Sequence, residues 1–314
     1  MYYIGIDLGG TNIAAGITDT EGNILYKGSL PTGASRGRDA IIDDIATLCR
    51  MLCRDAKIAF GEIGRIGIAV PGGVDAASGE ILFTPNIPLS GINICEILSA
   101  KLAGKPVLLA NDANAAALAE ARVGAARGAK DAVMITLGTG VGGGIVTDGK
   151  IYTGFNGLAA ELGHFVIQKD GVPCGCGRRG CFEAYASATA LIRMTKEELD
   201  RCFVSGEGTL MAESRKLNAR VAFDAYRAGD AAAKRVIETY IGYLASGIAS
   251  LINIFQPEVF IIGGGVSNEK QFLLDLLLPR IDAEDFAKNA KKRTRVVIAT
   301  CGNDAGIIGA AMNE

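Results

Sequence analysis

The chain has 314 residues, of which 49% are hydrophobic, and its formal net charge at pH 7 is -2. This length and apolar content allow a large core divided between two domains. The near-neutral charge gives no electrostatic basis for binding nucleic acid, which selects strongly basic surfaces. The longest apolar stretch, residues 240–255, is interrupted by glycine, serine and asparagine, which predicts a buried helix and no membrane partner.

Two segments about 129 positions apart repeat one pattern. Residues 6–11 read Ile-Asp-Leu-Gly-Gly-Thr, and residues 135–140 read Ile-Thr-Leu-Gly-Thr-Gly. An Asp/Gly turn follows in both copies, so each predicts a strand, a glycine turn, a strand, a second turn and a third strand. The duplication predicts two domains of similar topology, each presenting a glycine turn to a ligand.

After each copy, helical and strand patterns alternate along the chain. A strand pattern at residues 107–110 precedes a helical pattern at 113–122, and a long helical pattern at 238–255 precedes a strand pattern at 259–262. The final run, residues 305–312, predicts a helix that packs back on the first domain. This alternation is typical of an α/β fold.

The glycine turns are candidate phosphate-binding loops. Their backbone N–H groups, with the hydroxyls of Thr11 and Thr139, can approach a phosphate closely. Residues 138–143 also match G-x-G-x-x-G, but a hairpin pattern follows them instead of the helix that a dinucleotide-binding motif opens. An ordinary hairpin turn is the alternative for either copy alone, and the duplication favours phosphate binding.

Two aspartates follow predicted strands. Asp7 ends the first strand directly before a glycine turn, where a carboxylate can hold Mg²⁺ beside phosphates or simply cap the turn. Asp112 lies between a strand and a helix, where it is either a helix cap or a ligand-facing group at the carboxyl end of a strand. As a weak base Asp112 would suit phosphoryl transfer, which mainly requires orientation of the attacking hydroxyl.

The only histidine and three of the eight cysteines form a compact motif. One imidazole and three thiolates complete a tetrahedral Zn²⁺ site with no open position, which predicts a structural metal; an iron–sulfur cluster is the minor alternative. The remaining cysteines are scattered in apolar segments, which favours a reducing, cytoplasmic location over a disulfide framework. Glu161 and Glu183 flank the motif, so the metal would support a binding site. Its predicted ligands are His164, Cys174, Cys176 and Cys181.

Over nearly its full length the chain resembles the ROK family, most closely its bacterial glucokinases. The resemblance implies an actin-like (sugar kinase/Hsp70, ribonuclease H-like) two-domain ATPase fold with a cleft between duplicated α/β domains. We expect residues 1–116 with 303–314 in the smaller domain and 117–302 in the larger one. The motifs that carry the resemblance are Asp7–Thr11, Asn111–Asn114, Leu137–Gly140, Glu161–His164, Cys174–Glu183 and Gly263–Gly265.

The resemblance implies ATP-dependent phosphorylation of a hexose at its 6-hydroxyl, with Mg²⁺ and structural Zn²⁺ as cofactors and a homodimer as the assembly. Glucose is the first expectation for the hexose. Asp112 would be the catalytic base. Sugar hydroxyls would be bound by Asn86, Asn111, Asp112, Glu161, His164 and Glu183. ATP and its metal would be bound by Asp7, Gly9, Gly10, Thr11, Gly138, Thr139, Gly140, Gly263, Gly264 and Gly265.

Other substrates stay open. Many relatives carry a tryptophan soon after the proline of the segment at residues 86–91, and this chain contains no tryptophan. Because that loop is expected to close over the sugar, an N-acylmannosamine, fructose or allose kinase is an alternative. A sugar sensor without phosphoryl transfer is another, which Asp7, Asp112 and both glycine turns disfavour. Removal of zinc should affect sugar binding or folding before ATP contacts.

Overall fold

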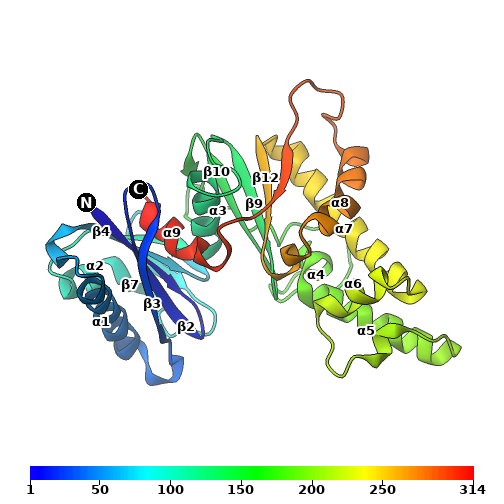
Figure 1. Ribbon diagram of the computed structural model, residues 1–314, viewed down its shortest axis with the longest axis horizontal. Coiled ribbons are helices and arrows are strands. Elements are labelled where there is room, and N and C mark those ends of the chain that lie inside the picture. Colours follow the sequence, from blue (N-terminus) through cyan, green and yellow to red (C-terminus); the bar gives the residue numbers. More distant parts are fainter. The chain divides into compact units, whose positions relative to one another are not determined.

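The computed structural model describes all residues, 1–314, and divides into two compact units (Figure 1). The first unit contains Met1–Ala132, Gly144–Ala160 and Ala299–Glu314, and the second contains Val133–Gly143 and Glu161–Ile298. The domain boundaries expected at residues 116 and 303 stay a prediction. Helices and strands alternate as the sequence predicted.

The first five-stranded sheet has the strand order β3-β2-β1-β4-β8. β1 pairs antiparallel with β2, and β2 with β3, whereas β1, β4 and β8 are parallel. Parallel strands end at the same edge of a sheet, so the ends of β1 and β8 bring Asp7 and Asp112 to one edge. The strands are β1 (Tyr2–Leu8), β2 (Asn12–Thr18), β3 (Ile24–Pro31), β4 (Ile63–Val70) and β8 (Val107–Asn111).

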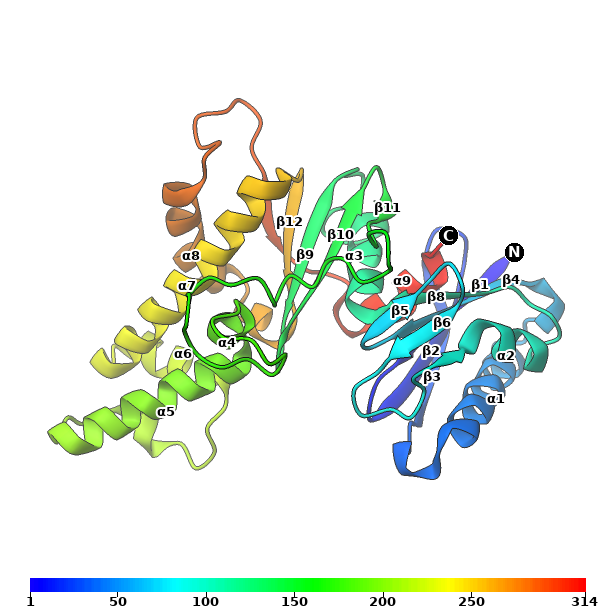
Figure 2. The ribbon, with the colours of Figure 1, turned by 180° about the vertical axis from the view of Figure 1, so that it is seen from behind.

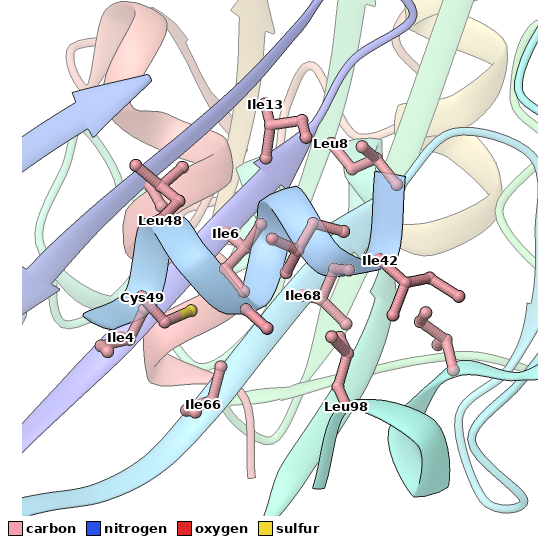
Figure 3. Close-up of a cluster of buried hydrophobic side chains, with 14 of the residues drawn as sticks. Ile4, Ile6, Leu8, Ile13, Ile42, Leu48, Cys49, Ile66, Ile68 and Leu98 are labelled. Carbon is pink, nitrogen blue, oxygen red and sulfur yellow. The ribbon is translucent and has the colours of Figure 1, made fainter. Parts of the chain in front are cut away.

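Helix α1 (Arg38–Ala56) covers one face of this sheet and contributes to the core drawn in Figure 3. Alternate residues of β1 point to this face, because side chains of a strand alternate between the two faces of its sheet. The labelled residues of the core are Ile4, Ile6, Leu8, Ile13, Ile42, Leu48, Cys49, Ile66, Ile68 and Leu98. All ten are at most 3% exposed.

Helix α9 (Ala305–Met312) packs against β1 and β4 at their glycines. A Cβ atom added to Gly5 would lie 1.8 Å from the carbonyl oxygen of Ile307, and one added to Gly67 would lie 1.7 Å from that of Ala310. Only glycine allows such a close approach of helix and strand. The prediction that the last helix packs on the first unit is therefore confirmed.

The other elements of the first unit surround this sheet. A small antiparallel sheet, visible in Figure 2, has the order β5-β6-β7. Its strands are β5 (Gly73–Asp75), β6 (Glu80–Phe83) and β7 (Ile92–Asn93). The helices of the unit are α1 (Arg38–Ala56), α2 (Ile94–Lys101), α3 (Asp112–Arg122) and α9 (Ala305–Met312).

The second five-stranded sheet has the order β11-β10-β9-β12-β13. Its first three strands form a meander and its last two follow much later in the chain, as in the first sheet. This equal strand order confirms the duplicated topology that the glycine-turn repeat predicted. The strands are β9 (Ala132–Leu137), β10 (Val141–Thr147), β11 (Lys150–Ile151), β12 (Val259–Gly263) and β13 (Arg295–Ile298).

The second unit contains a long buried helix, α7 (Ala231–Phe255), which begins seven residues before the predicted start. Its first turn is rich in alanine and lacks the large apolar residues at helical spacing from which the helix was predicted. Asp230 is the N-cap, and its side chain accepts the N–H of Ala233 at 2.7 Å. No helix of the chain has the length and apolar content that crossing a bilayer requires. The other helices are α4 (Glu183–Ala186), α5 (Ala188–Ser205), α6 (Ala219–Arg227) and α8 (Gln271–Glu284).

Candidate active site and metal site

Asp7 and Asp112 interact at the carboxyl edge of the first sheet. Burial, and to a lesser extent the nearby carboxylate of Asp112, raise the pKa of Asp7 to about 6. On the other side, a Cβ added to Gly306 at the start of α9 would lie 2.5 Å from the Asp7 carboxyl carbon. Two carboxylates enclosed in this way favour a bound cation, because a cation removes their mutual repulsion.

Asn111, not Asp112, is the N-cap of α3. Its Oδ1 accepts the N–H groups of Ala113 at 2.9 Å and Asn114 at 3.1 Å, and its Nδ2 donates to the carbonyl of Gly72 at 3.0 Å. Asp112 is the first residue of the helix, and its Oδ1 accepts the N–H of Ala113 at 2.8 Å. The capping alternative for Asp112 is thus wrong, because the preceding amide already performs that role.

The first glycine turn connects β1 to β2. The N–H of Gly9 donates to the carbonyl of Asn12 at 2.9 Å, and the hydroxyl of Thr32 donates to the carbonyl of Gly9 at 2.6 Å. Gly10 and Thr11 are exposed, and a Cβ added to Gly10 would meet no atom within 4 Å. The turn therefore has a fixed backbone and an open outer face, as a phosphate-binding loop requires.

The second glycine turn, between β9 and β10, is held by the start of α5. The N–H of Ala188 donates to the carbonyl of Gly138 at 2.9 Å, and the hydroxyl of Thr189 donates to the carbonyl of Thr139 at 2.7 Å. Both contacts come from a segment to which the sequence analysis assigned no role. No sequence signal identified them, since Ser187-Ala188-Thr189 reads as an ordinary helix start.

Gly264 lies against the strand end that leads into this turn. A Cβ added to Gly264 would lie 2.5 to 2.7 Å from backbone atoms of Leu137, and its φ of +81° is also a glycine conformation. The structure thus brings together two segments predicted to bind ATP, residues 138–140 and residues 263–265.

The four predicted metal ligands converge. The donor atoms of His164, Cys174, Cys176 and Cys181 lie within 4.8 Å of one another. The Nδ1 of His164 is 3.6 Å from the sulfur of Cys174, and the sulfurs of Cys176 and Cys181 are also 3.6 Å apart. In a tetrahedral site with Zn–S bonds near 2.3 Å, neighbouring sulfurs lie about 3.8 Å apart. The donor set and its spacing therefore fit a zinc ion.

The two acidic residues that flank the metal site contact its ligands. The Nε2 of His164 lies 4.0 Å from a carboxylate oxygen of Glu161, on the side of the ring away from the cysteines. The Oε1 of Glu183 lies 3.4 Å from the sulfur of Cys174, and its Oε2 accepts the N–H of Val141 at 2.9 Å. Glu183 thus contacts both the metal site and the residue after the second glycine turn.

Asn86 lies in the loop after β6. It is exposed, and its φ of +64° places it in the left-handed region, which asparagine tolerates better than most residues. The loop is held from within, because the hydroxyl of Thr84 donates to the carbonyl of Ile87 at 2.6 Å.

The fold and these side chains define an actin-like sugar-kinase class of protein, with duplicated α/β sheets, glycine turns and acidic residues at strand ends. The chain belongs to the ROK family, whose profile matches residues 3–313. The resemblance inferred from the motifs is confirmed.

Relatives cover almost the whole chain. A glucokinase from Thermotoga maritima is 39% identical over 310 residues, which span 98% of this chain and 95% of that protein. The crystal structure of a ROK hexokinase from Thermus thermophilus superposes with a TM-score of 0.83 at 35% identity, covering 99% of this chain and 97% of the other. A ROK glucokinase from Streptomyces griseus, in complex with glucose and AMPPNP, has a TM-score of 0.79 at 34% identity, covering 99% and 98%.

Proposed function

We propose that the protein is an ATP-dependent hexose kinase that converts glucose to glucose 6-phosphate. The observation that carries the proposal is the pair of interacting carboxylates, Asp7 and Asp112, at the carboxyl ends of β1 and β8. The glucokinases among its relatives support the choice of reaction and of glucose.

In the proposed reaction Asp112 is the catalytic base. It orients the sugar 6-hydroxyl and takes its proton while the hydroxyl oxygen forms a bond to the γ-phosphorus and ADP leaves. Asp112 is suited to this because Asn111 caps the helix, which leaves the Asp112 side chain half-buried at the sheet edge. The helix N-terminus at which it lies favours a negative charge there.

ATP would be held by the two glycine turns and by residues 263–265. Backbone N–H groups and the exposed Thr11 and Thr139 would contact the phosphates. Asp7 would hold Mg²⁺, which when bound neutralises charge on the transferred phosphoryl group.

Side chains with hydrogen-bonding groups available would hold the hexose. The Nδ2 of Asn111 gives one N–H to Gly72 and has a second for a sugar hydroxyl. Glu161 and the Nε2 of His164 would bind further hydroxyls, since Nδ1 is the nitrogen that faces the cysteines. Glu183 and Asn86 complete the predicted set.

Zinc would be structural. The four donors leave no coordination position for substrate or water, so the ion would fix the ring of His164 and the segment around it. The homodimer and the cytoplasmic location stay predictions of the family resemblance and the cysteine pattern; sedimentation would test the first.

A hexose panel tests the proposal. ATP consumption should be fastest with glucose among glucose, mannose, fructose, allose, N-acetylmannosamine and N-acetylglucosamine. A preference for an acylated sugar would replace glucose by the alternative substrate class. Binding of sugars without any turnover would instead favour the sensor, and would remove Asp112 from a catalytic role.

A further inference from the structure

We infer that Glu183 is a positioning residue that joins the metal site to the second glycine turn, so that occupancy of the metal site sets the geometry of that turn and the affinity for nucleotide. The second half of this inference rests on the proposed function, which assigns phosphate binding to residues 138–140. The contacts that carry it all lie within the second unit.

The first link runs from the carboxylate to the turn. The Oε2 of Glu183 accepts the N–H of Val141, which is 4% exposed, so this carboxylate satisfies a donor that has little access to water. A Cβ added to Gly140 would lie only 2.3 Å from the same oxygen. The carboxylate thus packs directly on the backbone of the turn, and glycine at position 140 is what allows it to do so.

The second link runs from the metal ligands to the backbone of Glu183. Its N–H donates to the carbonyl of Gly163 at 2.8 Å, and the N–H of Phe182 donates to the carbonyl of Phe165 at 2.8 Å. These bonds flank His164 on one segment and follow Cys181 on the other. A metal held by both ligands would therefore clamp the two segments that position Glu183.

A third contact joins the segment before His164 to Val141. A Cβ added to Gly163 would lie 2.2 Å from the carbonyl oxygen of Val141, so the segment before His164 packs on the same residue whose N–H binds Glu183. The turn is thus held from both sides by residues adjacent to metal ligands. Removal of the metal should loosen the turn as well as the sugar-binding residues, which extends the effect expected from the sequence.

Amide exchange measures the link without any nucleotide. In the metal-loaded wild-type protein, residues 138–143 should be protected, and a chelator should raise their exchange rate about tenfold or more, the effect expected for a hydrogen bond to a charged group. Glu183→Ala should show the same fast exchange while metal is bound, and chelation should then add little. Glu161→Ala, which removes the other acidic neighbour of the metal site, should retain wild-type exchange in this segment.

Nucleotide affinity is the second readout. The dissociation constant of AMPPNP should rise about tenfold on chelation and in Glu183→Ala, and should be unchanged in Glu161→Ala. Coupling is reciprocal, so AMPPNP should slow the loss of metal from the wild-type protein to a chelator. This last measurement needs no variant and no metal-free protein. It therefore tests the coupling between metal and nucleotide even if Glu183→Ala or the metal-free protein fails to fold.

Unchanged exchange of residues 138–143 after metal removal, or metal loss that bound, saturating AMPPNP does not slow, would overturn the inference even if glucose is phosphorylated. Failure of the proposed function has a different signature. In that case exchange of the turn would still respond to metal and to Glu183→Ala, while AMPPNP would not bind and no hexose would be phosphorylated.

Discussion

At the scale of single residues, the proposed role of Asp112 as catalytic base can be tested directly. Asp112→Asn keeps the size of the side chain and its contact with the N–H of Ala113, but removes the base. We expect kcat to fall about 100-fold or more, with glucose affinity largely retained. Steady-state kinetics and calorimetric titration with glucose would measure the two effects. Wild-type turnover would exclude Asp112 as the base.

Asp7 should make stability depend on pH. Its pKa is about 6 in the folded protein, above the ordinary value of about 4 in an unfolded chain. Between these values the folded state holds more protons than the unfolded state, so without Mg²⁺ this residue's contribution to stability falls as pH rises from about 4 to 6. At pH 7 the charged, buried carboxylate is destabilising unless a cation binds it.

Asp7→Asn tests this sign. In the absence of Mg²⁺ the variant should have a higher Tm than the wild-type protein at pH 7 and a smaller difference at pH 5. It should also lose any stabilisation by Mg²⁺. Thermal melts at the two pH values, with and without Mg²⁺, provide the measurement. If the change in Tm between pH 5 and pH 7 were the same in Asp7→Asn as in the wild-type protein, the assignment would be contradicted.

At the scale of elements, a buried carboxylate ties the end of α3 to the chain that enters α9. Glu120 is fully buried and accepts the N–H groups of Ala125 at 2.7 Å, Thr300 at 2.8 Å and Cys301 at 2.7 Å, with the hydroxyl of Thr300 at 3.2 Å. No sequence pattern indicated this role, since the residues involved lie about 180 positions apart.

Replacing Glu120 by glutamine should cost about 2 to 4 kcal/mol of unfolding free energy, because the amide NH₂ would face donors that are buried with it. Urea denaturation would measure the loss. Exposed Glu21→Gln is the matched control and should be near neutral. Equal stability of the two variants would mean that the segment at residues 299–302 is held by other contacts.

At the scale of the whole molecule, the metal should stabilise one unit selectively. Residues 161–182 contain no helix or extended strand, so the metal ligands are major links within this segment. Chelation should lower the Tm by about 5 °C or more and raise amide exchange in residues 161–183. The core strands β1 and β4 of the first unit should keep their protection. Loss of protection throughout the chain would indicate that the metal stabilises both units.

Local spacing in the sequence determined much of this protein. The duplicated glycine turns predicted two domains of similar topology, and the spacing of one histidine and three cysteines predicted a tetrahedral donor set, because each of these signals lies within short segments of the chain. The motif resemblance likewise identified the family.

Tertiary structure alone decided how these parts connect. It showed that the pKa of Asp7 is raised, that Glu120 accepts the N–H groups of residues 300 and 301, and that Glu183 accepts the N–H of Val141. Each of these depends on atoms that are distant in sequence or on burial, neither of which a local pattern contains. The residue types of each motif are thus visible in the local sequence, whereas the residues that contact the motif are determined by the packing of the folded chain.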